Sequence, residues 1–188
     1  MSIIRDTDMG YGNLKRLLKQ NKVSVDIGVF STSMTGKMFS ENSSSGKFIA
    51  EYAAYNEYGV DKIKGKDLGS SRKGLSLIRE GLGQSSIKAI PERSFMRSTF
   101  DEQEKNAFRV IGNVIKINML KPSFTLRKSA GYGGAFMRTE IVKKIKTASS
   151  WATPNAKSTI KRKGKNQPLI DKGILWKAIL WKIRPIGG

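Results

Sequence analysis

Glu51 and Glu57 are the two carboxylates whose spacing comes nearest to that of a catalytic pair. Two carboxylates can hydrolyse a glycosidic bond when both reach the same substrate bond. On a helix, however, a separation of six residues turns the side chains toward different sides, and they do not obviously converge. We therefore interpret these glutamates as members of a structural ion pair or of a solvated face.

Cysteine and histidine are both absent from the 188 residues. The chain therefore cannot build a thiol nucleophile, a disulfide, a zinc finger, an iron–sulfur cluster or a Ser-His-Asp triad. Gly46-Lys47 also does not match the phosphate-binding loop motif, because Phe48 follows where Ser or Thr is required. We expect no catalytic residue, no cofactor and no metal site, which makes an enzyme the weakest functional class.

Two further sequence patterns could indicate nucleic-acid binding, but each also has a purely structural interpretation. The run from Gly131 to Gly134 formally satisfies the KH loop pattern, but we interpret it as the tip of a loop over residues 123–135. Trp151, Trp176 and Trp181 stand near lysines and could stack on bases. Packing in a core or on a sheet explains their spacing more economically.

The net charge is +20, from 35 basic and 15 acidic residues. It is concentrated in residues 121–188, which carry 16 basic and 2 acidic groups. Such a surface favours a polyanion through counterion release, or an acidic protein surface through electrostatic steering; a solvated basic face without a dedicated partner is the third interpretation. The most basic clusters are Lys143, Lys144 and Lys146, and Lys157 with Lys161, Arg162, Lys163 and Lys165.

The elements that must position these residues are short strands and helices. Alternation of Val23, Val25, Ile27 and Val29 predicts a half-buried strand over 23–30. A second alternation predicts a closing strand over 175–183. Helices are expected over 12–20, 48–58 and 101–120, and Gly59 stands where a left-handed C-terminal cap of the second helix would fall. A short basic helix is expected over 154–163, capped by Thr153 and beginning at Pro154. Residues 137–146 are expected to form a strand or a short helix.

The longest predicted helix, 101–120, is the expected core helix. Acidic residues at its start complement the helix dipole, and Pro122 ends it. Its apolar stripe is Phe100, Ala107, Phe108, Ile111, Val114, Ile115 and Met119. The sequence therefore predicts an α+β fold, with a small antiparallel sheet packed around one long helix.

We expect a single domain over 1–188. It would have an N-terminal helix or arm over 1–21, a surface loop over 31–46, an inserted loop over 61–88, and a basic C-terminal segment with the closing strand over 147–188. The start lacks the features of a signal peptide, and no stretch is apolar enough to span a membrane. The expected location is therefore a cytosol-like compartment.

Three segments, in this order along the chain, resemble the neck proteins of long-tailed bacteriophages, also labelled tail-completion, minor tail or virion morphogenesis proteins. They follow the strand over 23–29, and the resemblance spans about residues 22–60 and 88–183. The segments are Ile49 to Gly59 (IAEYAAYNEYG), Ile90 to Arg97 (IPERSFMR), and Trp151 to Gly173, with its WATPN and PLIDKG ends.

The resemblance implies a non-catalytic structural protein of the virion. Family members have a small antiparallel sheet around a long helix and oligomerise as a ring, commonly six-fold, where the head connector meets the tail. The implied partners are other copies of the chain, the head–tail connector, tail terminator or tube proteins, and viral DNA that passes non-specifically. The implied location is the neck of the virion, after assembly in the host cytoplasm.

Two hypotheses about this interface follow. Glu57 is expected to pair with Arg93 or Arg97, because both segments end at turns near a sheet edge. The basic residues Lys143, Lys144, Lys146, Lys161, Arg162 and Lys163 are expected to meet acidic surfaces of ring neighbours. The alternative function is a basic nucleic-acid-binding protein of ribosomal or nucleoid type, whose affinity would fall steeply with salt.

Overall fold

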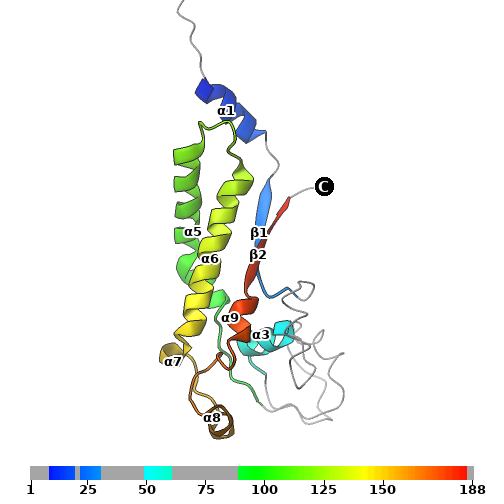
Figure 1. Cartoon of the computed structure of the whole chain (residues 1–188), viewed down its shortest axis with the longest axis vertical. Helices are drawn as coiled ribbons and strands as arrows, with labels where there is room; N and C mark the ends of the chain where they lie inside the picture. The colour runs from blue at the N-terminus through cyan, green and yellow to red at the C-terminus, as the bar shows by residue number, and fades with distance from the viewer. Residues whose placement is uncertain (1–8, 20–21, 31–48, 61–88, 186–188) are drawn as a thin grey trace, which may run out of the picture. The chain divides into compact units, whose positions relative to one another are not determined.

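The computed structural model describes residues 9–19, 22–30, 49–60 and 89–185 (Figure 1). The fold is α+β, as predicted: it is mostly helical, with a two-stranded antiparallel sheet and a long helix. The elements are α1 (Met9–Leu18), β1 (Val23–Gly28), α3 (Ile49–Tyr58), α5 (Arg97–Asn118), α6 (Leu126–Lys146), α7 (Ala148–Trp151), α8 (Lys157–Lys163), α9 (Ile174–Ala178) and β2 (Leu180–Pro185).

The chain divides into two compact units, each made of segments that are distant in sequence. The first unit contains residues up to 27, 99–140 and 181–188, and the second contains 28–98 and 141–180. Helices α5 and α6 each contribute to both units, so neither unit is a contiguous piece of chain.

In the first unit, α6 contacts both α5 and the sheet (Figure 1). Gly133 lies against α5, where a Cβ would come within 2.6 Å of the Ile111 side chain. Gly134 lies against the sheet, where a Cβ would be 2.9 Å from Val25 and 3.0 Å from Trp181. Glycine therefore lets α6 approach a neighbour on each side, which a larger side chain would prevent.

These contacts correct two predictions. The glycine run 131–134 is not a loop tip but part of the 21-residue helix α6, which also contains the predicted strand or short helix 137–146. The main core helix is α6 rather than α5, because Met137, Ile141 and Ile145 are buried whereas the only buried residue of α5 is Thr99. The predicted α5 stripe is half-buried, and its Phe108 is 64% exposed.

Helix α1 is bound to the connection between α5 and α6. Asn13 donates to the carbonyl of Leu120 at 2.7 Å, and Arg16 donates to that of Phe124 at 3.0 Å. Carbonyls that follow the end of a helix have no partner within that helix. The side chains of α1 supply such partners, while Leu17 is buried beside them.

In the second unit, α3 packs against α9 (Figure 1). Ala53 and Tyr55 of α3 and Leu175 and Ala178 of α9 are buried. Helix α3 ends at Gly59, whose φ of 67° is left-handed, as predicted from sequence. The chain then pairs with the next described segment, because Val60 and Ile90 exchange two backbone hydrogen bonds of 2.8 Å.

Some boundaries differ from those expected. The closing strand begins at Leu180, since residues 174–178 form α9. Helix α8 begins at Lys157 after Ala156, so Thr153 and Pro154 lie outside it; instead, their carbonyls accept hydrogen bonds from Arg93. The predicted loops over 31–46 and 61–88 lie outside the described residues. Within the described ranges, no helix is long and apolar enough to cross a membrane.

Candidate functional site

The three segments singled out in the sequence meet in the second unit, around Glu57 and Arg93. Helix α3 supplies Glu57 and Asn56, the segment before α5 supplies Arg93 to Arg97, and the chain after α7 supplies Thr153 and Pro154. Residues that are far apart in sequence therefore form one hydrogen-bonded cluster, which we call the three-segment junction.

Glu57 caps the N-terminus of α5 from another helix. Its side chain is only 4% exposed, and each oxygen accepts more than one hydrogen bond. Oε2 accepts the backbone N–H groups of Phe95 and Met96, both at 2.9 Å. Oε1 accepts the N–H of Arg97 at 2.8 Å and the hydroxyl of Ser94 at 2.9 Å. The carboxylate thus satisfies donors that begin a helix, where negative charge is also favoured by the dipole.

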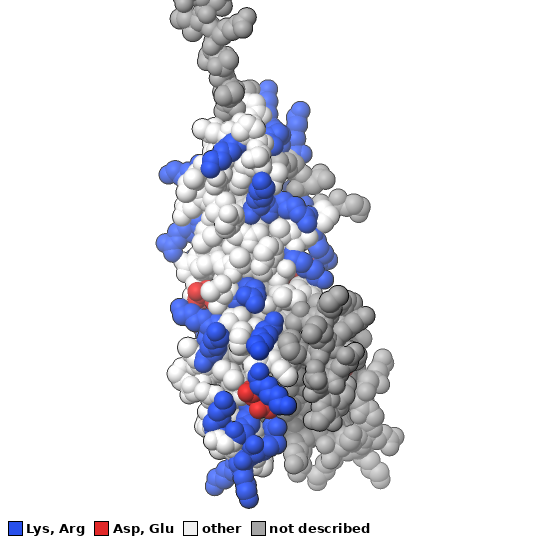
Figure 2. All heavy atoms as spheres, viewed as in Figure 1, with Lys and Arg blue, Asp and Glu red and all other residues white. Residues whose placement is uncertain are grey.

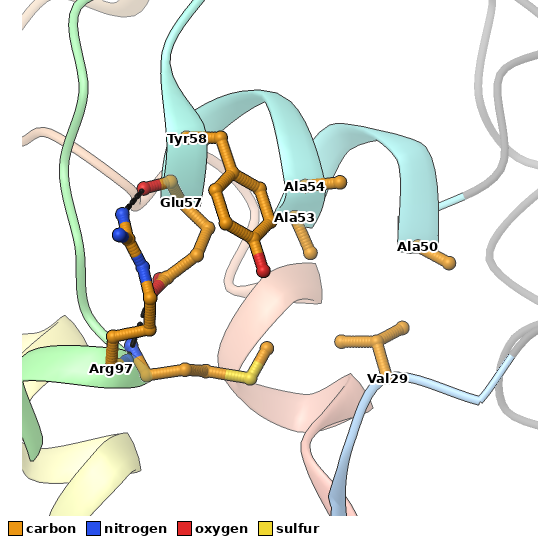
Figure 3. A pocket seen from close by; sticks show the side chains of 8 residues that line it. Val29, Ala50, Ala53, Ala54, Glu57, Tyr58 and Arg97 are labelled. Carbon is orange, nitrogen blue, oxygen red and sulfur yellow. Dashed lines mark hydrogen bonds and ion pairs between the residues drawn. The ribbon is translucent and has the colours of Figure 1, made fainter. Parts of the chain in front are cut away.

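Arg97 joins the same carboxylate through its side chain. Its Nε lies 3.3 Å from Glu57 Oε1, and Nη2 donates to the Glu57 carbonyl at 2.9 Å (Figure 3). Nη2 also donates to Glu92 at 2.6 Å, and the guanidinium lies 4.8 Å from the centroid of the Tyr58 ring. The hydrogen bond to Glu92, followed by that to Glu57, raises the pKa of Arg97 above its ordinary value.

Arg93 connects the three segments. Nη1 donates to Asn56 Oδ1 at 3.2 Å, Nε donates to the Thr153 carbonyl at 2.9 Å, and Nη2 donates to the Pro154 carbonyl at 3.1 Å. The residue is 7% exposed. Desolvation by burial lowers the pKa of Arg93, although the guanidinium remains far from neutrality at pH 7. The planar guanidinium has several N–H donors in fixed directions, so it can bind three acceptors on two other segments at the same time.

The predicted pairing of Glu57 with an arginine is therefore confirmed for Arg97, whereas Arg93 contacts Asn56 and backbone carbonyls instead. Because Glu57 and Arg93 are buried, their charged groups serve contacts within their own chain rather than an exposed interface. Sequence reasoning missed Asn56 and Ser94. The signal available for both was that they stand inside the two segments already singled out.

A small hollow of about 160 Å³ lies beside the junction (Figure 3). Ala50, Ala53 and Ala54 of α3 line one side with Val29 opposite, and Met96 also lines the hollow. Ordinary small-molecule pockets have volumes of about 300–1,000 Å³. The hollow is small and mostly apolar, and the one carboxylate at its edge, Glu57, is already bound by five donor groups.

No protein-family model, curated protein or solved structure matches the chain. Its interpretation therefore depends on the geometry of its own residues. Within the described ranges, no group of three or more acidic side chains could hold a metal ion. The junction joins α3, the start of α5 and the segment after α7 through hydrogen bonds.

The basic residues named from sequence differ in their contacts and in their exposure. Some contact groups of their own chain: Lys144 Nζ lies 5.3 Å from the centroid of the Trp151 ring, and Lys146 Nζ lies 4.6 Å from that of Trp176. Lys143 is exposed at the end of α6, and Lys161 and Arg162 are exposed on α8, where Arg162 lies 3.5 Å from Asp171. Figure 2 shows basic side chains over much of the visible face, with few acidic ones.

Lys163 also contacts groups of its own chain. Its ammonium donates to the carbonyls of Ile170 at 2.6 Å and Gln167 at 3.1 Å, so it holds the turn after α8. Desolvation by burial lowers the pKa of Lys163, and nearby Asp171 partly opposes this. Trp181 packs against Gly131 and Gly134, which confirms the predicted packing role for that tryptophan. Lysines over Trp151 and Trp176 occupy ring surface that a stacked base would need.

Proposed function

We propose that this protein is a structural subunit of a bacteriophage neck, which assembles as a ring between the head connector and the tail and lets DNA pass. The observation that carries the proposal is the three-segment junction. The three segments that resemble neck proteins were chosen from sequence alone, yet they meet in one cluster, where Arg93 and Glu57 bind groups from all of them.

The character of the junction favours a structural role over a catalytic one. A general acid or base must present a polar atom to its substrate. The Glu57 carboxylate instead faces backbone and side-chain donors of its own chain, and Arg93 faces an amide and two carbonyls. Such buried networks fix the relative placement of helices, which is what a subunit of an assembly requires.

The proposal is tested in particles of the phage that encodes the chain. An antibody or a small fused tag on the protein should locate it at the head–tail joint in electron micrographs. Deletion of its gene should give separate heads and tails. Full-length particles that lack the protein, or label elsewhere, would contradict the proposal.

A basic nucleic-acid-binding protein is the second candidate, favoured by the 16 basic groups of residues 121–188. The two functions differ in their salt dependence. A dedicated nucleic-acid binder loses affinity by orders of magnitude between about 50 and 200 mM salt, because phosphate contacts release counterions. A ring subunit would bind DNA weakly and without sequence preference at the lower salt concentration.

A further inference from the structure

The first turns of α5 carry the densest group of acidic residues in the part of the chain that the structure describes. Asp101, Glu102 and Glu104 stand within four positions, and all three are exposed. This is unusual in a chain of net charge +20. The acidic residues Asp26, Glu92 and Asp171 each pair with an arginine of the same chain.

Two exposed aromatic residues share the helix face with these acids. Phe100, Glu104 and Phe108 follow one another four residues apart, and Asp101 lies beside them, within about 100° around the helix. Phe100 is 39% exposed and Phe108 is 64% exposed. Lys105 borders the group. We call Phe100, Asp101, Glu104 and Phe108 the acidic–aromatic face.

Helix α8 presents the complementary charge. Lys157 and Lys161 are four residues apart on one side of the helix, and Lys165 follows directly after Gly164, which ends it. All three lysines are exposed. We call these three lysines the basic face. Arg162 and Lys163 are not included, because Arg162 lies 3.5 Å from Asp171 and the Lys163 ammonium donates to backbone carbonyls.

We propose that the basic face of one copy binds the acidic–aromatic face of the next copy, which makes a head-to-tail contact. This inference rests on the proposed ring. Copies of a chain with net charge +20 repel one another, so self-association needs a contact at which the local charge is reversed. A contact between two different surfaces of the same chain can repeat from copy to copy and close into a ring.

A second copy fits both surfaces better than a nucleic acid does. Phosphates would neutralise Lys157 and Lys161, but they would leave the acidic–aromatic face without a partner. The alkyl parts of lysine side chains can cover aromatic rings while their ammonium groups reach carboxylates. One contact with another copy therefore accounts for the exposed Phe100 and Phe108 and for both charge groups.

Charge reversal in the full-length chain tests the contact. The first variant carries Asp101→Lys and Glu104→Lys, and the second carries Lys157→Glu and Lys161→Glu. Each variant places like charges on the two faces, which should raise the protein concentration at half-assembly by about tenfold or more. Sedimentation velocity at low salt measures this, and circular dichroism with urea unfolding checks that each variant folds.

Restoration gives the sharper result. A chain with all four reversals should assemble again. An equimolar mixture of the two variants should also assemble, since every contact between unlike variants joins opposite charges. Lys116→Glu with Lys172→Glu is the control for net charge, because it changes the total as much as the second variant does and leaves both faces intact. This control should assemble as the unaltered chain does.

Other outcomes would overturn the contact. If the second variant loses both assembly and affinity for a short DNA duplex, and neither the fourfold variant nor the mixture recovers assembly, the basic face binds a polyanion. If the unaltered chain forms a ring that no reversal affects, the ring stands and this contact does not. If the unaltered chain stays monomeric at all concentrations and salts, the ring and the contact both fail.

Discussion

The Glu57 carboxylate oxygen Oε1 accepts the backbone N–H of Arg97 at 2.8 Å and lies 3.3 Å from the Nε of the same residue. One side chain of α3 therefore binds the first residue of α5 in two ways. The other carboxylate oxygen binds the amides of Phe95 and Met96. The start of the long helix α5 is therefore fixed by a residue from another helix.

Removal of this carboxylate should be strongly destabilising. Glu57→Ala leaves buried amide donors and part of the Arg97 guanidinium without their acceptor, which should lower the free energy of unfolding by about 3 kcal/mol or more. Urea denaturation measures the change. Lys116→Ala, at an exposed site on α5, is the control and should change the value by less than about 0.5 kcal/mol. A loss for Glu57→Ala as small as that of the control would refute the capping role.

Arg93 should not tolerate lysine. A lysine ammonium cannot reach the Asn56, Thr153 and Pro154 oxygens from one planar group, so Arg93→Lys should leave acceptors unpaired and cost about 2 kcal/mol. Arg127→Lys, on an exposed part of α6, supplies the comparison and should be nearly neutral. Equal unfolding free energies for both lysine variants would mean that Arg93 does not join the three segments.

Substitution of alanine for two glycines on the long helices should change the stability of the protein in opposite directions. At Gly134 a Cβ would lie 3.0 Å from the rigid Trp181 ring, so Gly134→Ala should destabilise by about 1–3 kcal/mol. At Gly112 no atom lies within 4 Å of a Cβ, so Gly112→Ala should stabilise α5 by about 0.5–1 kcal/mol. Thermal unfolding of both variants measures the two signs. A stabilising Gly134→Ala would contradict the close packing of α6 on the sheet.

The Asp26–Arg184 pair between β1 and β2 should make a contribution to stability that is lost in acid. Arg184 donates to Asp26 at 2.8 Å, and this hydrogen bond lowers the pKa of Asp26 below its ordinary value of 3.8. The folded chain then binds fewer protons at this carboxyl than the unfolded chain does. The stabilisation is therefore complete well above pH 3.8, begins to weaken as the pH approaches that value, and disappears as the pH falls through the lower folded value.

Comparison with Asp26→Asn measures this contribution. The unfolding free energy of the unaltered chain minus that of Asp26→Asn should be positive at neutral pH. The same difference should shrink between about pH 5 and pH 2. The exposed position of Arg184 keeps the effect small, and a difference that grows toward acid would show that the pKa of Asp26 is raised instead.

Much of the fold follows from local patterns in the sequence. In the sequence, alternating apolar residues indicated β1, acidic residues at the start of an apolar stripe indicated α5, and Gly59 indicated the end of α3. The position of the core helix did not follow, because α6 is packed through glycines that resemble loop residues. Glycine has low helix propensity, and its reason for standing here is the approach of Ile111 on one side and Trp181 on the other, which are both distant in sequence.

The candidate site was predictable to a similar extent. The resemblance selected the segments that meet, and the expected pairing of Glu57 with Arg93 or Arg97 is confirmed for Arg97. The partners of Arg93 could not be predicted, since two of them are backbone carbonyls. Every residue has a backbone carbonyl, so the residue types at 153 and 154 do not indicate this contact. The same holds for Lys163, which stands in a basic run but donates to carbonyls of the following turn.

The mass of the full-length protein in solution tests the central proposal most directly. Mass photometry over a range of concentrations, at low and at physiological salt, should show a single assembly with an integral number of subunits, and electron microscopy should show it as a ring. A protein that remains monomeric under all these conditions, and whose measured mass changes only when DNA is added, would contradict the ring and favour the nucleic-acid-binding alternative.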